Sequence, residues 1–137
     1  MPDAEKPDLK LLGSSSDLPQ SPSAEILETF ANHSPHRKYW IKLDCAEFSS
    51  HCPVTGQPDY AQLQIAYIPG ELCVETKSLK YYLASFRHTA AFNEEIVNRI
   101  ADDLMAVCQP QKLEVFGQFA ARGGISLSVE VTYPEPD

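Results

Sequence analysis

Hydrophobic and polar residues alternate along two early stretches of this chain. In residues 38–48 apolar side chains occupy every second position, and Lys42 and Asp44 stand between them. Residues 60–68 repeat the alternation, and Pro69-Gly70 ends it. A period of two is typical of strands with one buried face. The pattern therefore predicts two antiparallel strands joined by a loop.

Two helices are predicted in the middle of the chain. In residues 77–87 the apolar positions follow the i, i+3, i+4, i+7 spacing of one helix face. Residues 92–108 carry a second such face, and Gln109-Pro110 ends it. The predicted core faces are Leu79, Tyr82, Leu83 and Phe86 in the first helix, and Ile96, Ile100, Leu104 and Val107 in the second.

Alternation returns in the last part of the chain. Residues 113–119 and 125–131 are predicted as two more strands, and Arg122-Gly123-Gly124 forms the turn between them. The element order β-β-α-α-β-β favours an α+β fold, in which both helices cover one face of an antiparallel four-stranded sheet. The long edge strands and the polar opposite face lead us to expect oligomerisation.

The first 23 residues differ in composition from the rest. They contain four prolines and the run Ser14-Ser15-Ser16, but few large apolar side chains. Such a segment buries too little surface to offset its chain entropy. We therefore predict a disordered tail over residues 1–23 and a single domain over residues 24–137, a size that supports one hydrophobic core.

The charge balance excludes some classes of partner. With 19 acidic and 11 basic residues, the chain has a net charge of -8, which argues against nucleic acid or an anionic membrane as its main partner. No apolar run is long enough to span a bilayer, and no signal peptide is recognisable. The four cysteines form no Cys-x-x-Cys pair, so no metal site is predicted. These features favour a cytoplasmic protein with reduced thiols.

One cysteine stands out by its position. Cys52 lies in the predicted loop between the first two strands, which Pro53, Gly56 and Pro58 make rigid. A cysteine must be ionised to act as a nucleophile. Asp59, at the far end of the loop, could take or return the proton. The alternative is a packed cysteine with an aspartate that caps the turn.

A second candidate site lies at the start of the first predicted helix. Residues 75–80, Glu-Thr-Lys-Ser-Leu-Lys, combine two ammonium groups, a hydroxyl and free backbone N–H groups, a set that suits a phosphate-bearing ligand. Arg122, beside two glycines, could add a fork-shaped phosphate contact. The alternatives are a solvated helix face that carries two lysines and an exposed arginine in a turn.

The start of the second predicted helix carries polar residues. Asn93 is predicted as its N-cap, and Glu94 and Glu95 complement the helix dipole. These structural roles are enough to explain the presence of all three residues. As an alternative, a buried Glu94 carboxylate could accept two parallel hydrogen bonds from a guanine-like N–H and NH2 edge. His51 and His88 are interpreted as loop residues rather than metal ligands.

Together these motifs resemble a known family. The segments at 52–59, 75–82, 85–87, 92–95 and 122–125 are similar to those of the NADPH-dependent nitrile reductases of queuosine biosynthesis, the 7-cyano-7-deazaguanine reductases, in their short single-module form. The Glu-x-Lys-Ser-x-Lys box, 23 residues after the cysteine, is the most specific part. The resemblance implies a tunnelling fold (T-fold) assembled into homo-oligomeric rings, with active sites between subunits.

The resemblance, which covers about residues 25–133, also implies a chemistry. Cys52 would add to the nitrile carbon of a deazapurine as a covalent thioimide, Asp59 would handle protons, and NADPH would deliver two hydrides in succession. Glu94 and Asn93 would bind the substrate. The residues implied in cofactor binding are Glu75, Lys77, Ser78, Lys80 and Arg122.

The chain departs from the family pattern at two positions. Thr76 stands where the family usually has Ser or Leu. More importantly, the family usually has histidine before the binding glutamate, whereas this chain has Asn93, which can hydrogen-bond a ligand but cannot exchange a proton near neutral pH.

Three other functions are compatible with parts of the pattern. A relative that forms an amidine would attack the same thioimide with ammonia or an amine, and it would not need the lysine box. A zinc-dependent pterin-type cyclohydrolase would need a Cys/His ligand set that the spacing does not supply. A non-catalytic purine-binding or scaffolding ring protein would agree with the presence of Asn93 where the family usually has histidine.

Overall fold

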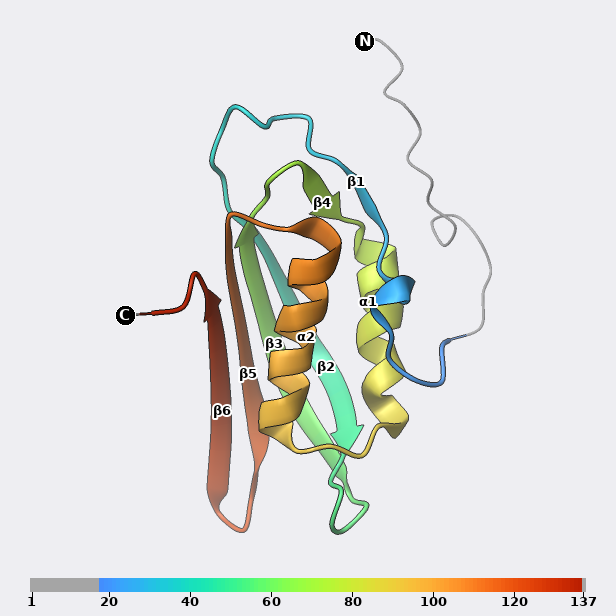
Figure 1. The fold of residues 1–137 in the computed structure, drawn as a ribbon. Helices are drawn as coiled ribbons and strands as arrows, with labels where there is room; N and C mark the ends of the chain where they lie inside the picture. The colour runs from blue at the N-terminus through green and yellow to red at the C-terminus, as the bar shows by residue number, and fades with distance from the viewer. Residues whose placement is uncertain (1–17, 137) are drawn as a thin grey trace.

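The computed structural model describes residues 18–136, which form an antiparallel four-stranded sheet with both α-helices on one face (Figure 1). The strands lie in the order β2-β3-β5-β6. The predicted fold class and element order are therefore confirmed. The elements of these two layers are β2 (Ile41–His51), β3 (Pro58–Ile68), α1 (Thr76–Ala84), α2 (Asn93–Cys108), β5 (Lys112–Arg122) and β6 (Ile125–Tyr133).

Four short elements are not predicted as such from the sequence. β1 (Thr29–Ala31) pairs with β4 (Leu72–Val74) in a separate antiparallel sheet. One 3-10 helix, Ala24–Ile26, precedes β1, and another, Ser85–His88, continues α1. Segments of three or four residues are too short to show a period. The first predicted helix therefore ends earlier than predicted as an α-helix and continues as a 3-10 helix.

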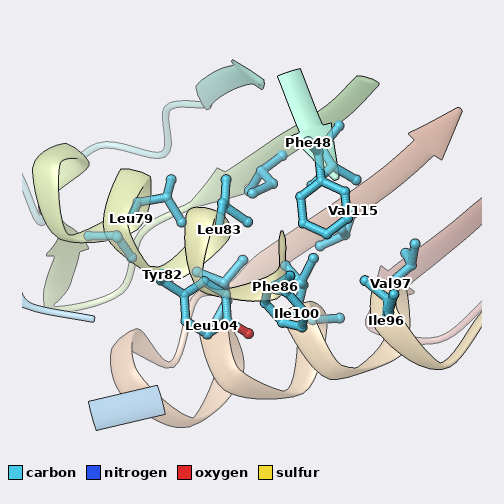
Figure 2. Close-up of a cluster of buried hydrophobic side chains, with 14 of the residues drawn as sticks. Phe48, Leu79, Tyr82, Leu83, Phe86, Ile96, Val97, Ile100, Leu104 and Val115 are labelled. Atoms are coloured by element: carbon cyan, nitrogen blue, oxygen red, sulfur yellow. The ribbon is translucent and has the colours of Figure 1, made fainter. Parts of the chain in front are cut away.

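The apolar faces of the two helices pack together against the sheet (Figure 2). The ring centroid of Phe86 lies 5.6 Å from that of Phe48 on β2 and 5.3 Å from that of Tyr82 on α1. Cys108, rather than Val107, completes the buried face of α2. Among residues 18–136, neither α-helix is long and apolar enough to cross a bilayer. The other predicted core residues are buried as expected: Leu79, Leu83, Ile96, Ile100 and Leu104.

A bulge in β2 changes which of its side chains face the helices. Up to Cys45 the strand pairs with β3 in one register, and from Phe48 onward the pairing is shifted by one residue. The extra residue of a bulge resets the alternation of side chains between the two faces of the sheet. Phe48 and Ser50 are buried after the bulge. The strand therefore points Ser50 inward and continues beyond its predicted end to the Cys52 loop.

The described end of the predicted tail contacts the helices, while residues 1–17 lie outside the described part of the chain. Arg87 Nη1 donates a hydrogen bond to the carbonyl oxygen of Pro19, and Arg99 Nη2 donates one to that of Pro22, both at 2.8 Å. The hydroxyl of Ser23 then accepts a hydrogen bond at 3.2 Å from the N–H of Glu25, in the first 3-10 helix. These contacts fix the path of residues 18–23.

Candidate active site

A closed loop presents Cys52 at the end of the β2–β3 hairpin. The N–H of Cys52 donates to the carbonyl oxygen of Gln57, and the N–H of Gly56 donates to the carbonyl oxygen of Cys52, both at 2.9 Å. Gly56 has a φ of 71°, in the left-handed region that glycine adopts without strain. The loop is therefore held by its own backbone, in agreement with the rigidity that its prolines and glycine predict.

The surroundings of Cys52 make its thiol more acidic. Hydrogen bonds from the Thr55 side chain, and from the backbone of Thr55 and Val54, lower the pKa of Cys52 to about 7, and the Arg122 side chain adds a smaller effect in the same direction. A pKa near 7 leaves about half of the thiol ionised at neutral pH. Cys52 is thus available as a nucleophile under ordinary conditions.

Asp59 lies beside the loop as the second residue of β3. Its side chain is 8% exposed, and it pairs across the sheet with the buried Ser50 of β2. Its Oδ1 atom is 3.3 Å from Arg122 Nε. A carboxylate at the end of the hairpin that carries the thiol is suited to exchange a proton with it. The structure therefore places Cys52 and Asp59 on the same hairpin, on either side of its turn.

Arg122 lies at the same end of the molecule, at the end of β5. Besides the ion pair with Asp59, its Nη2 donates to Gln57 Oε1 at 2.9 Å and to the carbonyl oxygen of Pro58 at 3.4 Å. The resemblance grouped Arg122 with the lysines of the α1 box as a cofactor residue. In the described chain, its hydrogen-bond and ion-pair partners lie in or next to the Cys52 loop instead.

The segment before α2 runs beside the end of β2. The N–H of His51 donates to the carbonyl oxygen of Thr89 at 2.9 Å, and the N–H of Ala91 donates to the carbonyl oxygen of His51 at 3.1 Å. This pairing brings the start of α2, with Asn93 and Glu94, to the Cys52 end of the sheet (Figure 1).

The prediction that Asn93 is the N-cap of this helix is wrong. Phe92 is the N-cap residue, and Asn93 is the first residue of α2, because the paired segment before it fixes where the helix begins. The Oδ1 atom of Asn93 is buried without a hydrogen-bond partner among the described residues, and so is the Oγ atom of Ser50. Buried polar atoms nearly always have partners. The two atoms therefore mark this region as one that suits a polar ligand.

Sequence reasoning did not propose Ser50. Strict alternation along β2 from Ile41 and Leu43 would have placed Ser50 on the opposite face from the core. Only the bulge turns its side chain inward, opposite Asp59. No signal in the sequence marks that bulge.

Glu94 is exposed in the described chain, not buried as the guanine-binding interpretation assumed. Its backbone oxygen accepts a hydrogen bond from Asn98 Nδ2 at 2.8 Å, within α2. Its carboxylate has neither a hydrogen bond nor an ion pair within residues 18–136. A role in binding a purine edge therefore requires a further surface to cover Glu94.

At the start of α1, by contrast, the polar groups are paired within the chain. Glu75 is the N-cap residue, and its carboxylate accepts from the N–H groups of Lys77 at 2.6 Å and Ser78 at 2.9 Å. Ser78 is fully buried, and its hydroxyl donates to the carbonyl oxygen of Glu75 at 2.7 Å and accepts from the N–H of Glu28 at 2.9 Å. The prediction of free N–H groups at this helix start is wrong, because the Glu75 carboxylate occupies them.

The lysine side chains of the box lie next to aromatic and apolar groups. Lys77 Nζ is 5.9 Å from the centre of the Tyr81 ring. Lys80 is exposed and lines a cavity of about 620 Å3 between α1 and β2. Apolar side chains such as Leu43 and Leu79 form much of the cavity wall. An ammonium group beside an apolar cavity fits the phosphates and rings of a dinucleotide such as NADPH.

The lysine box and Cys52 lie at opposite ends of the molecule (Figure 1). α1 begins beside β4 at one end, whereas the Cys52 loop, the β5–β6 turn and the start of α2 lie at the other. α1 alone, with 9 residues, spans about 13 Å. The described chain by itself therefore does not bring the lysine box to Cys52.

Comparison with known proteins identifies the family of the chain. The chain matches the family model of the QueF-like proteins over residues 58–137. The NADPH-dependent 7-cyano-7-deazaguanine reductase of Bacteroides thetaiotaomicron is 47% identical over 131 residues, which is 96% of this chain and 87% of that protein. The reductase of the same name from Magnetococcus marinus is 49% identical over 112 residues, which is 82% of this chain and 88% of that protein.

A solved structure has a similar fold. The archaeosine synthase QueF-Like, in its apo form, aligns with a TM-score of 0.64 and 19% identity, covering 68% of this chain and 91% of that one. At this identity the likeness shows the fold alone, and it confirms the tunnelling fold that the resemblance implied. From the family model and the relatives at nearly half identity, we conclude that the chain belongs to the NADPH-dependent 7-cyano-7-deazaguanine reductase family.

Proposed function

We propose that this protein reduces the nitrile of 7-cyano-7-deazaguanine to an aminomethyl group with NADPH, as a step in the biosynthesis of tRNA queuosine. Its relatives are named for this reductase activity. The observation that carries the proposal is the Cys52 loop, in which an acidified thiol lies on the same hairpin as a buried carboxylate. A nitrile carbon is an electrophile that such a thiol can attack.

In the first step, the Cys52 sulfur bonds to the nitrile carbon. Asp59 accepts the thiol proton and passes it to the nitrile nitrogen, which gives a covalent thioimide without any change in the number of electrons. The hydrogen bonds of the Thr55 side chain and backbone favour the ionised thiol that begins this step.

The start of α2 binds the deazaguanine ring in this mechanism. The unpaired Asn93 Oδ1 suits a ring N–H, and the Glu94 carboxylate suits an edge with an N–H and an NH2 group. Because Asn93 cannot exchange a proton near neutral pH, proton transfer depends on Asp59.

When bound, NADPH would supply the two hydrides that reduce the thioimide to the amine, and the bond between the substrate carbon and the Cys52 sulfur breaks, which returns the thiol. Lys77 and Lys80 hold its phosphates in this proposal, and Lys80 lines the cavity between α1 and β2. Glu75 and Ser78 act indirectly, because they fix the first turn of α1 and so the directions of the two lysine side chains.

The active site of this proposal forms between subunits of a homo-oligomeric ring. One chain keeps its lysine box and Cys52 at opposite ends, so a neighbouring copy would supply one of them. The edge strand β6 exposes Ile125 at 74%, Leu127 at 36% and Tyr133 at 44%, an apolar area that another copy would cover. Light scattering on the purified protein tests this: a mass of several chains is expected, and a stable, active monomer would contradict it.

The proposal also includes a cytoplasmic location. All four cysteines, Cys45, Cys52, Cys73 and Cys108, are free in the structure. A reducing compartment keeps Cys52 as the thiol that the chemistry requires.

Steady-state oxidation of NADPH in the presence of 7-cyano-7-deazaguanine tests the proposal. Nitrile-dependent oxidation is expected, with the aminomethyl compound as product and two NADPH consumed for each nitrile, because the reduction takes four electrons. The same preparation without nitrile is the control. A folded, oligomeric sample that consumes no NADPH, or that consumes the nitrile only when ammonia is added, would contradict it.

A further inference from the structure

Arg122 connects three parts of the Cys52 end of the molecule. Its Nε lies 3.3 Å from Asp59 Oδ1. Its Nη2 donates to Gln57 Oε1 at 2.9 Å and reaches the carbonyl oxygen of Pro58 at 3.4 Å. One guanidinium thus contacts both the buried Asp59 carboxylate and Gln57. The backbone oxygen of Gln57 in turn accepts a hydrogen bond from the N–H of Cys52.

The pairing of the strands explains how Arg122 reaches this position. β3 and β5 are antiparallel, and Ala61 lies opposite Phe119. The pairing ends there, and beyond it the Arg122 side chain reaches the carbonyl oxygen of Pro58, at the end of the Cys52 loop. The β5–β6 pairing shifts by one residue between Phe119 and Arg122, which marks a bulge or irregularity there. A bulge can re-aim a side chain, here toward the buried side on which Asp59 lies.

We propose that Arg122 is a positioning residue for the reaction of Cys52, which holds the Cys52 loop and the Asp59 carboxylate in one fixed arrangement, rather than a residue that binds the cofactor. This inference rests on the proposed function. It differs from the role that the resemblance implied for Arg122.

The contacts of Arg122 favour the positioning role. Its Nε and Nη2 atoms already contact Asp59, Gln57 and Pro58, so a phosphate that bound these two atoms would have to displace existing contacts. A planar guanidinium with several donors is well suited to hold a carboxylate and carbonyl groups at the same time.

The positioning role predicts two separate consequences. Loss of the guanidinium frees the loop from Asp59, so the proton exchange between thiol and carboxylate becomes less well oriented. Loss of its side-chain hydrogen bond also removes one of the contacts that lower the pKa of Cys52, after the larger effects of Thr55 and Val54. Both changes act on Cys52 and neither acts on NADPH.

The first test measures Cys52 itself and needs no turnover. We would follow alkylation by iodoacetamide as a function of pH, with the modified peptide identified by mass, in the wild type, R122Q, R122K and the control K112Q. Lys112 lies at the other end of β5 and is exposed. For R122Q, the midpoint should move to higher pH and the rate at pH 7 should fall about twofold, as for a half-unit rise in pKa. K112Q should match the wild type, and R122K should recover part of the loss.

The second test separates the two roles by kinetics. R122Q should lower kcat by about tenfold or more, as expected for a misplaced reacting group, and leave the KM for NADPH unchanged. A large rise in the KM for NADPH, with the alkylation profile of Cys52 unchanged, would overturn the proposal and support cofactor binding. If the wild type reduces no nitrile, the proposed function fails, but the alkylation profiles still decide whether Arg122 acts on Cys52.

Discussion

The two ends of this molecule are organised in opposite ways. At the Cys52 end, the thiol has a lowered pKa, and two buried polar atoms, Asn93 Oδ1 and Ser50 Oγ, lack partners among the described residues. At the start of α1, Glu75 and Ser78 are paired with backbone groups of the same chain. The first end thus keeps buried polar atoms without partners in the described chain, whereas the helix start at the second end pairs its Glu75 and Ser78 side chains.

Because of this difference, residues that form one motif in the sequence have different surroundings in the structure. The box at residues 75–80 looks like one phosphate-binding unit in the sequence. In the structure, Glu75 and Ser78 build the helix start, and Lys80 is left exposed beside the cavity. Residues of the box should therefore respond differently to mutation: some should change stability and others cofactor affinity.

The largest effect of a single substitution is expected at Asp59, at the Cys52 end of the molecule. D59N keeps the shape of the side chain but removes its ability to take the thiol proton, so kcat should fall by about a hundredfold or more, with thermal stability close to that of the wild type. D102N, at an exposed position of α2, is the matched control and should be fully active. Full activity of D59N would show that another group transfers the proton.

A smaller effect is expected at Lys80. K80A removes an exposed ammonium group next to the cavity, so the KM for NADPH should rise about tenfold, as for a lost charge-assisted hydrogen bond, while the free energy of unfolding stays the same. Steady-state kinetics and chemical unfolding measure the two quantities. A KM like that of the wild type would remove Lys80 from the cofactor site.

Glu75 should show the reverse behaviour. E75A removes the carboxylate that caps α1, so the free energy of unfolding should fall by about 1 to 2 kcal/mol. T76A, at the exposed neighbouring position, is the control and should be much less affected. If E75A is as stable as the wild type but has lost its affinity for NADPH, then Glu75 binds the cofactor directly and the contrast between the two ends is wrong.

The smallest effect concerns the pH dependence of Cys52. Its pKa is lowered to about 7, so the reactive thiolate increases as pH rises through 7. T55V removes the largest cause of this shift, the side-chain hydrogen bond, and should move the alkylation midpoint to higher pH. The alkylation rate at pH 7 should fall about threefold. An unchanged midpoint would mean that the backbone of the loop alone sets the pKa.

The sequence predicted the type and order of the long elements because each has a period that burial of one face imposes. It also predicted that Cys52 lies in a rigid loop with Asp59 at its end. These features depend on residues close together in the chain. They could therefore be recognised from local pattern alone.

The features that the sequence did not predict depend on pairing between distant segments. Ser50 faces inward only because β2 has a bulge, and Arg122 meets Asp59 only because β5 pairs with β3. Asn93 is not the N-cap because the preceding segment pairs with His51. Local propensities cannot report such contacts.

Intact-mass spectrometry of the protein incubated with 7-cyano-7-deazaguanine in the absence of NADPH tests the central claim most directly. The wild type and C45A should each gain the mass of one nitrile molecule per chain, and peptide mapping should place it on Cys52, whereas C52A should gain none. An adduct of equal yield on C52A, or no adduct on a folded and oligomeric wild type, would contradict the role of Cys52 as the nucleophile.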